Sequence, residues 1–281
     1  DHLVQADPVE GEVCFARFEA RGRSHVGDQR GDVARLLERL FHQLQVIAGH
    51  SLLQLAQAML NHGQRDRQVV CGVADVGFEG FIAVQARQTL EETQWLLELA
   101  DEHDVIRGVV GWADLRNPAV DEHLEILCDH TKLVGIRHVV QDESNDRFML
   151  QDDFLRGISK LGKCGLVYDI LVFARQLPAT LEMVSHFPRQ RFVLNHIGKP
   201  DIASGEMEPW ASRMHELAQH ENIFCKVSGM VTEGDRDAWT PEGLRPYIDV
   251  VFDAFGAERL MIGSDWPVSL VAGSYAQTMG V

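Results

Sequence analysis

The feature that most restricts the fold of this chain is a regular alternation of short apolar runs and longer amphipathic stretches from residue 77 onward. Each run has the continuous apolar character of a strand buried on both faces of a parallel sheet. The predicted strands span residues 80–85, 105–112, 133–140, 165–171, 191–196, 222–228 and 260–265. The predicted helices span 89–102, 120–130, 152–162, 177–186, 209–220 and 241–255. Repeated βα units of this kind predict an α/β fold with right-handed crossovers.

Seven such strands suit either a doubly wound sheet or a (β/α)8 barrel in which one strand is unrecognisable. A doubly wound nucleotide-binding fold should carry an early glycine-rich phosphate loop, and neither GxGxxG nor GxxxxGKS/T occurs. Most predicted strands instead end on a residue able to do chemistry, and a barrel gathers strand ends into one ring. These residues are Gln85, Arg87, Trp112, Asp114, Arg137, His138, Tyr168, Asp169, Asn195, His196, Lys226, Ser228 and Asp265. The barrel is therefore favoured, with its closing helix truncated because Val281 follows the last strand closely.

Residues 1–75 differ in composition from the rest of the chain. They contain no Lys, Trp, Tyr or Thr, although residues 76–281 use all four. Apolar residues at helical spacing predict two helices, at 33–41 and 51–60. We therefore divide the chain into an atypical segment, 1–75, and a barrel domain, 76–281. The segment is either a divergent first β/α unit or the product of a wrong reading frame, and the second explanation is favoured.

Composition narrows the classes of partner. The formal net charge is −16, with 42 acidic and 26 basic residues, which disfavours nucleic acid and anionic membranes. No apolar run of about 18 residues and no signal peptide is recognisable. The five cysteines are scattered without metal-site spacing, so reduced thiols and a cytoplasmic location are expected. A small polar molecule is the expected substrate, and the oligomeric state is left open.

Asp265 is the strongest candidate for catalysis. The apolar run Leu260-Met-Ile stops at Gly263-Ser264, which places Asp265 at the carboxyl end of a buried strand. Barrel enzymes do their chemistry at that face, so this carboxylate is a candidate base or metal ligand. The alternative is an N-cap of the following helix, for which Asp is a preferred residue.

Other strand ends supply candidate partners for Asp265. His196 is a candidate metal ligand or water-orienting group, or else a core histidine bonded to a carbonyl group. Arg137 and His138 alternate in direction along a strand, so only one of them faces the barrel interior, and we expect it to be Arg137. Its guanidinium would hold substrate oxygens or polarise a carbonyl.

The remaining candidates also have simpler structural explanations. We predict substrate-binding roles for Gln85, Lys226, Tyr168 and Trp266. Lys226 would serve equally well in an ion pair inside the barrel, and tryptophan on an apolar face is more often part of the core. Lys199, in the loop after residue 196, would meet a substrate carboxylate or simply be solvated.

Several segments together resemble a known family. They are Gly80-Phe-Ile-Ala-Val-Gln-Ala-Arg-Gln, Gly108-Val-Val-Gly-Trp-Ala-Asp-Leu, Gly135-Ile-Arg-His, Phe192-Val-Leu-Asn-His-Ile-Gly-Lys-Pro, Cys225-Lys-Val-Ser-Gly and Ile262-Gly-Ser-Asp-Trp-Pro. In this order and spacing they resemble the amidohydrolase-related (amidohydrolase 2) branch of the amidohydrolase superfamily, from about residue 76 to the C-terminus. That branch includes hydrolases of sugar lactones and pyrone-dicarboxylate lactonase.

The resemblance implies a distorted TIM barrel with a His-x-His on strand 1, a His on a middle strand and an Asp on strand 8. His196 and Asp265 match the last two positions. No His-x-His occurs in this chain, so the predicted site for one divalent metal, zinc or manganese, is incomplete. A metal-free route through Asp265, His196 and Arg137 is the alternative.

Three functions are compatible with these residues. The first is hydrolysis of a sugar or dicarboxylate lactone by water, with Asp265 as the base. The second is decarboxylation or hydration on the same scaffold, since a fold does not fix a reaction. The third is an inactive or binding-only fragment, because a barrel without strand 1 has two exposed sheet edges.

Overall fold

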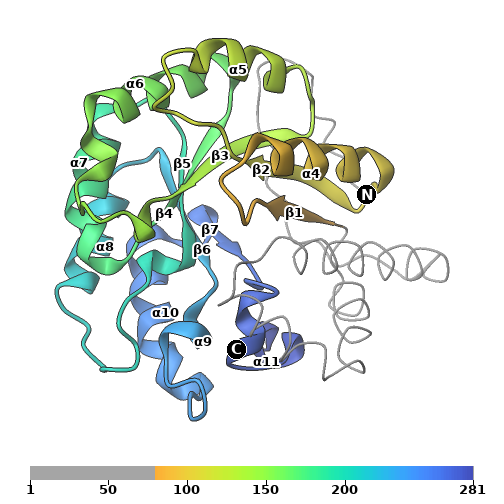
Figure 1. The fold of residues 1–281 in the computed structure, drawn as a ribbon. Helices are drawn as coiled ribbons and strands as arrows, with labels where there is room; N and C mark the ends of the chain where they lie inside the picture. The colour runs from red at the N-terminus through yellow and green to blue at the C-terminus, as the bar shows by residue number, and fades with distance from the viewer. Residues whose placement is uncertain (1–79, 281) are drawn as a thin grey trace, which may run out of the picture.

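A computed structural model describes residues 80–280 of the chain, so the predicted boundary near residue 75 and the helices predicted at 33–41 and 51–60 lie outside it. Seven parallel strands form one sheet in the order β1-β2-β3-β4-β5-β6-β7 (Figure 1). Their bounds are β1 Phe81–Val84, β2 Ile106–Gly111, β3 Leu133–Val139, β4 Val167–Leu171, β5 Phe192–Leu194, β6 Ile223–Val227 and β7 Leu260–Ile262. Each lies inside a predicted strand.

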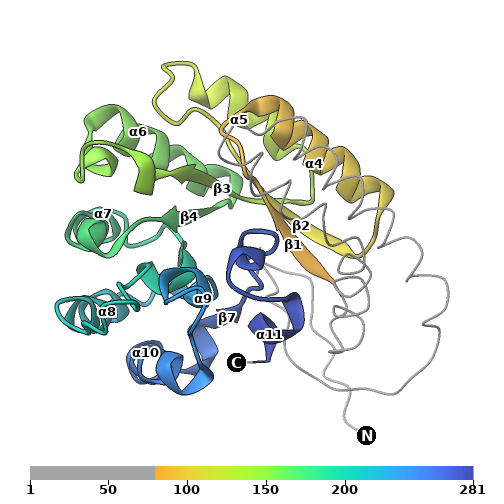
Figure 2. The same cartoon turned by 60° about the horizontal axis from the view of Figure 1, so that its bottom comes forward.

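The sheet is curled, and the helices lie along its outer side (Figure 2). The larger ones are α4 Leu90–Glu102, α5 Val120–Cys128, α6 Asp152–Leu161, α7 Leu177–His186, α8 Trp210–Ala218 and α10 Pro241–Phe255. They match the six predicted helices. Among the pairings of residues 80–280, β1 is joined only to β2 and β7 only to β6. Although the described strands do not close into a ring, seven parallel strands in a curled sheet with helices on its outer side confirm the predicted α/β class and distorted TIM-barrel architecture.

Local sequence explains where the helices begin. Thr89 caps α4 by accepting a hydrogen bond from the Glu92 N–H at 3.2 Å. The Glu92 carboxylate does not complete a capping box but reaches further back, to the N–H groups of Ala86 and Arg87. It thereby joins the loop after β1 to the first turn of α4. Helix α10 begins with Thr240 as its N-cap and Pro241 in its first turn, a favoured combination.

Strand register decides which side chains meet the helices. Tyr168 pairs with Ile136 on one side and with Phe192 on the other, and all three are fully buried. The Tyr168 ring packs edge-on against Phe154 of α6 and against Phe192. Because side chains alternate along a strand, this row lies on the helix-facing side, and Arg137 and Asp169, the next pair in register, face the barrel interior.

The C-terminal region after β7 contains short elements. A 3-10 helix, η7 Val268–Val271, is followed by α11 Tyr275–Met279, a helix of five residues whose N-terminus is capped by Ser274. None of the helices in residues 80–280 is long and apolar enough to cross a membrane.

A disulfide corrects one expectation from the sequence. Cys128, at the end of α5, is bonded to Cys164 in η3 Gly162–Cys164, with a Cα–Cα distance of 5.8 Å. The prediction of reduced thiols is therefore wrong for this pair. Cys225 is free and buried, and Cys14 and Cys71 lie outside the described residues. The two partners are 36 residues apart, too far apart for the spacing to predict their meeting.

Gly157 allows α6 to approach the loop after β2, and this contact is testable. A Cβ at position 157 would lie 2.1 Å from the Leu115 carbonyl oxygen, so Gly157→Ala should destabilise the protein by about 1–3 kcal/mol through overpacking. Chemical denaturation would measure this loss. Gly243→Ala in α10 is the control, since its Cβ would find only Thr240 Oγ1 at 3.5 Å, and it should stabilise by about 0.4–1 kcal/mol. Equal effects at both positions would contradict the packing argument.

Candidate active site

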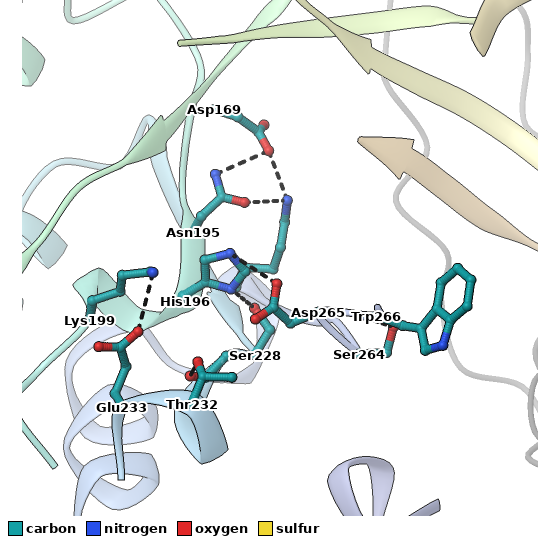
Figure 3. Close-up of polar contacts among 12 residues, drawn as sticks. Asp169, Asn195, His196, Lys199, Ser228, Thr232, Glu233, Ser264, Asp265 and Trp266 are labelled. Atoms are coloured by element: carbon teal, nitrogen blue, oxygen red, sulfur yellow. Dashed lines mark hydrogen bonds and ion pairs between the residues drawn. The ribbon is translucent and has the colours of Figure 1, made fainter. Parts of the chain in front are cut away.

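His196 and Asp265 meet at the carboxyl end of the sheet (Figure 3). His196 lies in η5 Asn195–Gly198, which follows β5, and Asp265 follows β7. The His196 Nε2 atom is 3.5 Å from Asp265 Oδ1, and the side chains are 10% and 14% exposed. The structure thus brings together the two residues that the sequence selected as the centre of the site.

An unusual backbone conformation holds both residues in place. His196 has φ 53°, Ile197 has φ 47° and Asp265 has φ 52°, which are left-handed values that rarely suit non-glycine residues. Each costs about 1–3 kcal/mol and persists only where its surroundings enforce it. Here the Trp210 indole N–H donates to the Ile197 carbonyl at 2.7 Å, and the Ile197 side chain is fully buried. Such strain is concentrated at functional sites in other proteins.

Ser228 and Gly229, which follow β6, fix the orientation of the His196 ring. Ser228 Oγ lies 2.9 Å from His196 Nδ1, and Ser228 is buried. A Cβ at position 229 would lie 2.7 Å from the same nitrogen, so only glycine permits this approach. The sequence indicated Ser228 as a strand-end residue but gave it no role. The signal that would have found it is the Ser-Gly pair at the end of a buried strand.

Burial sets the protonation of the two groups. Burial raises the pKa of Asp265 to about 6, against the opposing charges of Lys199 and Arg137. Burial, followed by the nearby charge of Lys199, lowers the pKa of His196 well below its usual value. At neutral pH the site therefore holds a neutral imidazole beside a carboxylate that is ionised but more basic than usual.

Lys226 has a partner inside the barrel. Its ammonium group donates to Asp169 Oδ2 and to Asn195 Oδ1, both at 2.8 Å. Asn195 in turn donates to Asp169 Oδ2 at 3.3 Å, and Asp169 is almost wholly buried. These contacts make Lys226 a member of an ion pair, and Figure 3 shows two of its partners, Asp169 and Asn195, near His196. This was one of its two predicted roles.

Arg137 faces the barrel interior, as predicted from alternation. Its Nη2 donates to the Gln85 carbonyl, and Gln85 Nε2 donates to the Arg137 carbonyl at 3.0 Å. Arg137 Nε and Gln85 Oε1 are buried without a hydrogen-bond partner among residues 80–280. Burial lowers the pKa of Arg137, and the charges of Asp169 and Asp265 oppose this shift. Two of the predicted substrate-contacting residues therefore carry unused hydrogen-bonding capacity.

His138 lies on the other side of β3 from Arg137. Its Nε2 is 2.8 Å from Glu143 Oε1, and its ring stacks on Phe148 at a centroid distance of 5.0 Å. Trp112 Nε1 donates to its Nδ1 at 3.4 Å. His138 is thus part of the packing against the helix layer.

Tyr168 and Trp266 are not brought to the His196–Asp265 pair. Tyr168 is fully buried on the helix-facing side of β4, opposite in direction to Asp169. The Trp266 indole extends away from His196 in Figure 3. The substrate-binding role predicted for Tyr168 conflicts with this direction, because the strand pleat turns the ring into the core.

The donors present in residues 80–280 do not fit a catalytic zinc site. Such sites use three protein ligands, whereas His196 and Asp265 supply two. No group of three or more His, Cys, Asp or Glu side chains placed to hold a metal occurs within the described part of the chain. Within residues 80–280, His196 and Asp265 are thus the two metal-ligand side chains at this site.

Comparison with known sequences places the chain in a family. A family described as Amidohydrolase matches residues 59–279. The chain belongs to this amidohydrolase family. The predicted resemblance is thereby confirmed, and with it the assignment to a family of hydrolases.

Two relatives of this chain are named as lactonases. An L-fucono-1,5-lactonase of Burkholderia multivorans is 44% identical over 204 residues, which are 69% of this chain and 69% of that protein. An L-fucono-1,5-lactonase of Burkholderia ambifaria is 39% identical over 72% of this chain and 70% of that protein. Lactonases hydrolyse the C–O bond of a cyclic ester, so these close relatives are C–O hydrolases.

Solved amidohydrolase structures agree with the fold. A Burkholderia multivorans amidohydrolase crystallised with bound zinc superposes with TM-score 0.70 at 41% identity, covering 74% of this chain and 75% of that one. A probable 2-pyrone-4,6-dicarboxylic acid hydrolase from Acinetobacter baumannii superposes with TM-score 0.64 at 16% identity, over 76% of this chain and 79% of that one. The second likeness shows a shared fold alone.

The Lys226 ion pair gives a stability prediction. Lys226→Met should cost about 3–5 kcal/mol of unfolding free energy, because it leaves the Asp169 carboxylate buried without its cation. Adding Asp169→Asn should recover much of that loss, since the unpaired charge is removed. Urea denaturation of the single and double variants would measure both effects. The exposed pair Arg147–Glu182 is the control, and Arg147→Met should change stability by less than about 1 kcal/mol.

Proposed function

We propose that this chain hydrolyses a sugar lactone, with Asp265 as the general base that activates water. The observation that carries the proposal is a buried carboxylate whose pKa is raised to about 6, held 3.5 Å from a neutral imidazole at the carboxyl end of the sheet. A base with a pKa just below the working pH is mostly ionised and still accepts a proton readily. The two L-fucono-1,5-lactonase relatives, at 44% and 39% identity, support a sugar lactone as the substrate class.

The proposed reaction has two steps. In the first, Asp265 takes a proton from water while the water oxygen bonds to the lactone carbonyl carbon, and the carbonyl oxygen becomes an oxyanion. In the second, the oxyanion collapses and the ring C–O bond breaks. The departing ring oxygen takes the proton from Asp265, which leaves a hydroxy acid and the original carboxylate.

Two further groups would assist these steps. The buried guanidinium of Arg137, whose positive charge acts on Asp265, would stabilise the developing oxyanion electrostatically. The imidazole of His196, held by Ser228, would hydrogen-bond an attacking water that lies to one side of the pair and also contacts Asp265.

We further propose that the reaction proceeds through these side chains without a resident metal ion. A relative at 41% identity binds zinc in its crystal structure, so a divalent ion is the natural alternative. The proposal rests on the donor set, in which His196 and Asp265 are two ligands where catalytic zinc takes three. Zinc or manganese would require a further ligand from outside residues 80–280.

Decarboxylation receives no comparable support. A 2,6-dihydroxybenzoate decarboxylase superposes with TM-score 0.51 at 12% identity, a likeness that shows the fold alone. If the protein hydrolysed no lactone, the third function considered in the sequence analysis, binding without catalysis, would be favoured instead.

The role of Asp265 predicts a pH dependence. Hydrolysis of an aldono-1,5-lactone should increase as the pH rises through about 6 and level off above it, because the base acts only when deprotonated and its pKa is raised to about 6. Asp265→Asn should lower kcat by about 10²–10⁴-fold. Stopped-flow assays with a pH indicator would measure both. A rate that falls across this range, or an Asp265→Asn variant with unchanged kcat, would contradict the assignment.

The metal-free route predicts insensitivity to chelators. Incubation with EDTA and dialysis should leave kcat within about 2-fold of the untreated protein, because no step depends on a bound ion. Metal analysis of the purified protein should find less than one equivalent of zinc or manganese. Loss of activity on EDTA treatment, with recovery on adding zinc, would show that a metal and an additional ligand are required.

A further inference from the structure

A second charged pair lies beside His196 and Asp265. Lys199, just after η5, is joined to Glu233 at the end of α9 Met230–Glu233, with 3.2 Å between Nζ and Oε1. Their side chains are only 14% and 19% exposed. Figure 3 shows the pair next to the His196 ring. The expectation that Lys199 would be solvated is therefore wrong.

The charges of this pair act on the site. Lys199 is the nearby charge with the largest influence on both Asp265 and His196, lowering the pKa of each. Glu233 opposes it at Asp265, where its negative charge raises the pKa. Both charged groups are therefore close to the site.

The two side chains are held in position from several directions. Lys199 has the left-handed φ of 48°, and its N–H donates to the His196 carbonyl at 2.8 Å, which fixes the turn. The Lys199 Nζ atom lies 5.2 Å from the centroid of the Phe173 ring. The Glu233 carbonyl accepts a hydrogen bond from Ala203 N–H at 3.0 Å. The pair is thus preorganised, unlike a surface ion pair, which must order two long side chains.

We propose that the Lys199–Glu233 pair binds the ring hydroxyl groups of a polyhydroxylated lactone and so selects for sugar lactones. This inference rests on the proposed lactonase function. The Glu233 carboxylate accepts hydrogen bonds from hydroxyl groups, and the Lys199 ammonium donates hydrogen bonds to hydroxyl oxygens. The two opposite charges stay paired with each other while they do so.

The chemistry of the pair predicts discrimination by hydroxyl content. A site built to hydrogen-bond hydroxyl groups rejects an analogue that lacks them, because its polar groups then lose water without gaining a partner. δ-Valerolactone has the six-membered ester ring of an aldono-1,5-lactone but no ring hydroxyl. The wild-type protein should therefore strongly prefer the hydroxylated lactone.

The test compares kcat/KM for L-galactono-1,5-lactone and δ-valerolactone in variants of the pair. Glu233→Gln and Lys199→Met should each lower the ratio of kcat/KM for the hydroxylated lactone to kcat/KM for δ-valerolactone by about 100-fold, mainly through KM. Their effect on the pKa of Asp265 acts on both lactones alike and cancels in this ratio. Lys199→Arg, which retains the charge, should recover part of the loss. Glu182→Gln, at the exposed Arg147–Glu182 pair, is the matched control and should alter neither substrate.

A binding measurement separates this inference from the proposed function. Calorimetric titration with L-galactonate, the ring-opened hydroxy acid, should give binding to the wild-type protein that Glu233→Gln weakens at least 10-fold, whether or not the protein turns over a lactone. If neither lactone is hydrolysed but the acid binds in this way, the lactonase proposal fails and the hydroxyl site stands. Variants that lower kcat/KM equally for both lactones, or that leave both values unchanged, would overturn the role of the pair. The same conclusion would follow if Glu233→Gln did not weaken binding of the acid. Thermal melts of each variant would identify loss of folding.

Discussion

The structure depends above all on the register of its parallel strands. Pairing Arg137 with Asp169 on neighbouring strands sends both side chains to the barrel interior, and the adjacent pair, Ile136 and Tyr168, is sent to the helices. A shift of one residue would exchange these sets and place two charges in the apolar layer. Register is therefore enforced by the cost of burying a charge without a partner.

The same constraint explains how charges are tolerated inside the barrel. Lys226, Asp169 and Asn195 satisfy one another within 3.3 Å, so the buried ammonium and carboxylate keep hydrogen-bond partners. Among residues 80–280, Asp265 forms no ion pair with Lys or Arg, and burial raises its pKa to about 6. Asp169 and Asp265 thus differ: the first is paired with a cation, and the second has a raised pKa.

Much of this fold was predictable because periodicity and strand direction are properties of short segments. The seven strands and six larger helices lie where apolar runs and helical spacing placed them. The pairing of His196 with Asp265 followed from the ring of strand ends. Alternation required that only one of Arg137 and His138 face inward, and Arg137, the residue we expected, does so. Tyr168 was misplaced because its strand neighbour Asp169 was an equally plausible inward residue, and sequence alone did not decide which faced the interior.

Other parts of the site left little trace in the sequence. Glu233 lies on α9, a helix of four residues, which is too short to show a period. The contact between Ser228 and His196 joins residues 32 positions apart, and the disulfide joins residues 36 apart. The left-handed backbone at His196 and Asp265 contradicts local preference and exists only because the surrounding fold enforces it.

That enforced backbone has a consequence for how the protein tolerates change. Ile197 is β-branched and adopts φ 47°, yet its side chain is fully buried. Replacing it with glycine or asparagine would relieve the main chain and at the same time open a void next to His196. The gain from a relaxed backbone and the loss from an unfilled core would therefore oppose each other at this one position, so neither substitution is expected to stabilise the protein by the full cost of the strained φ.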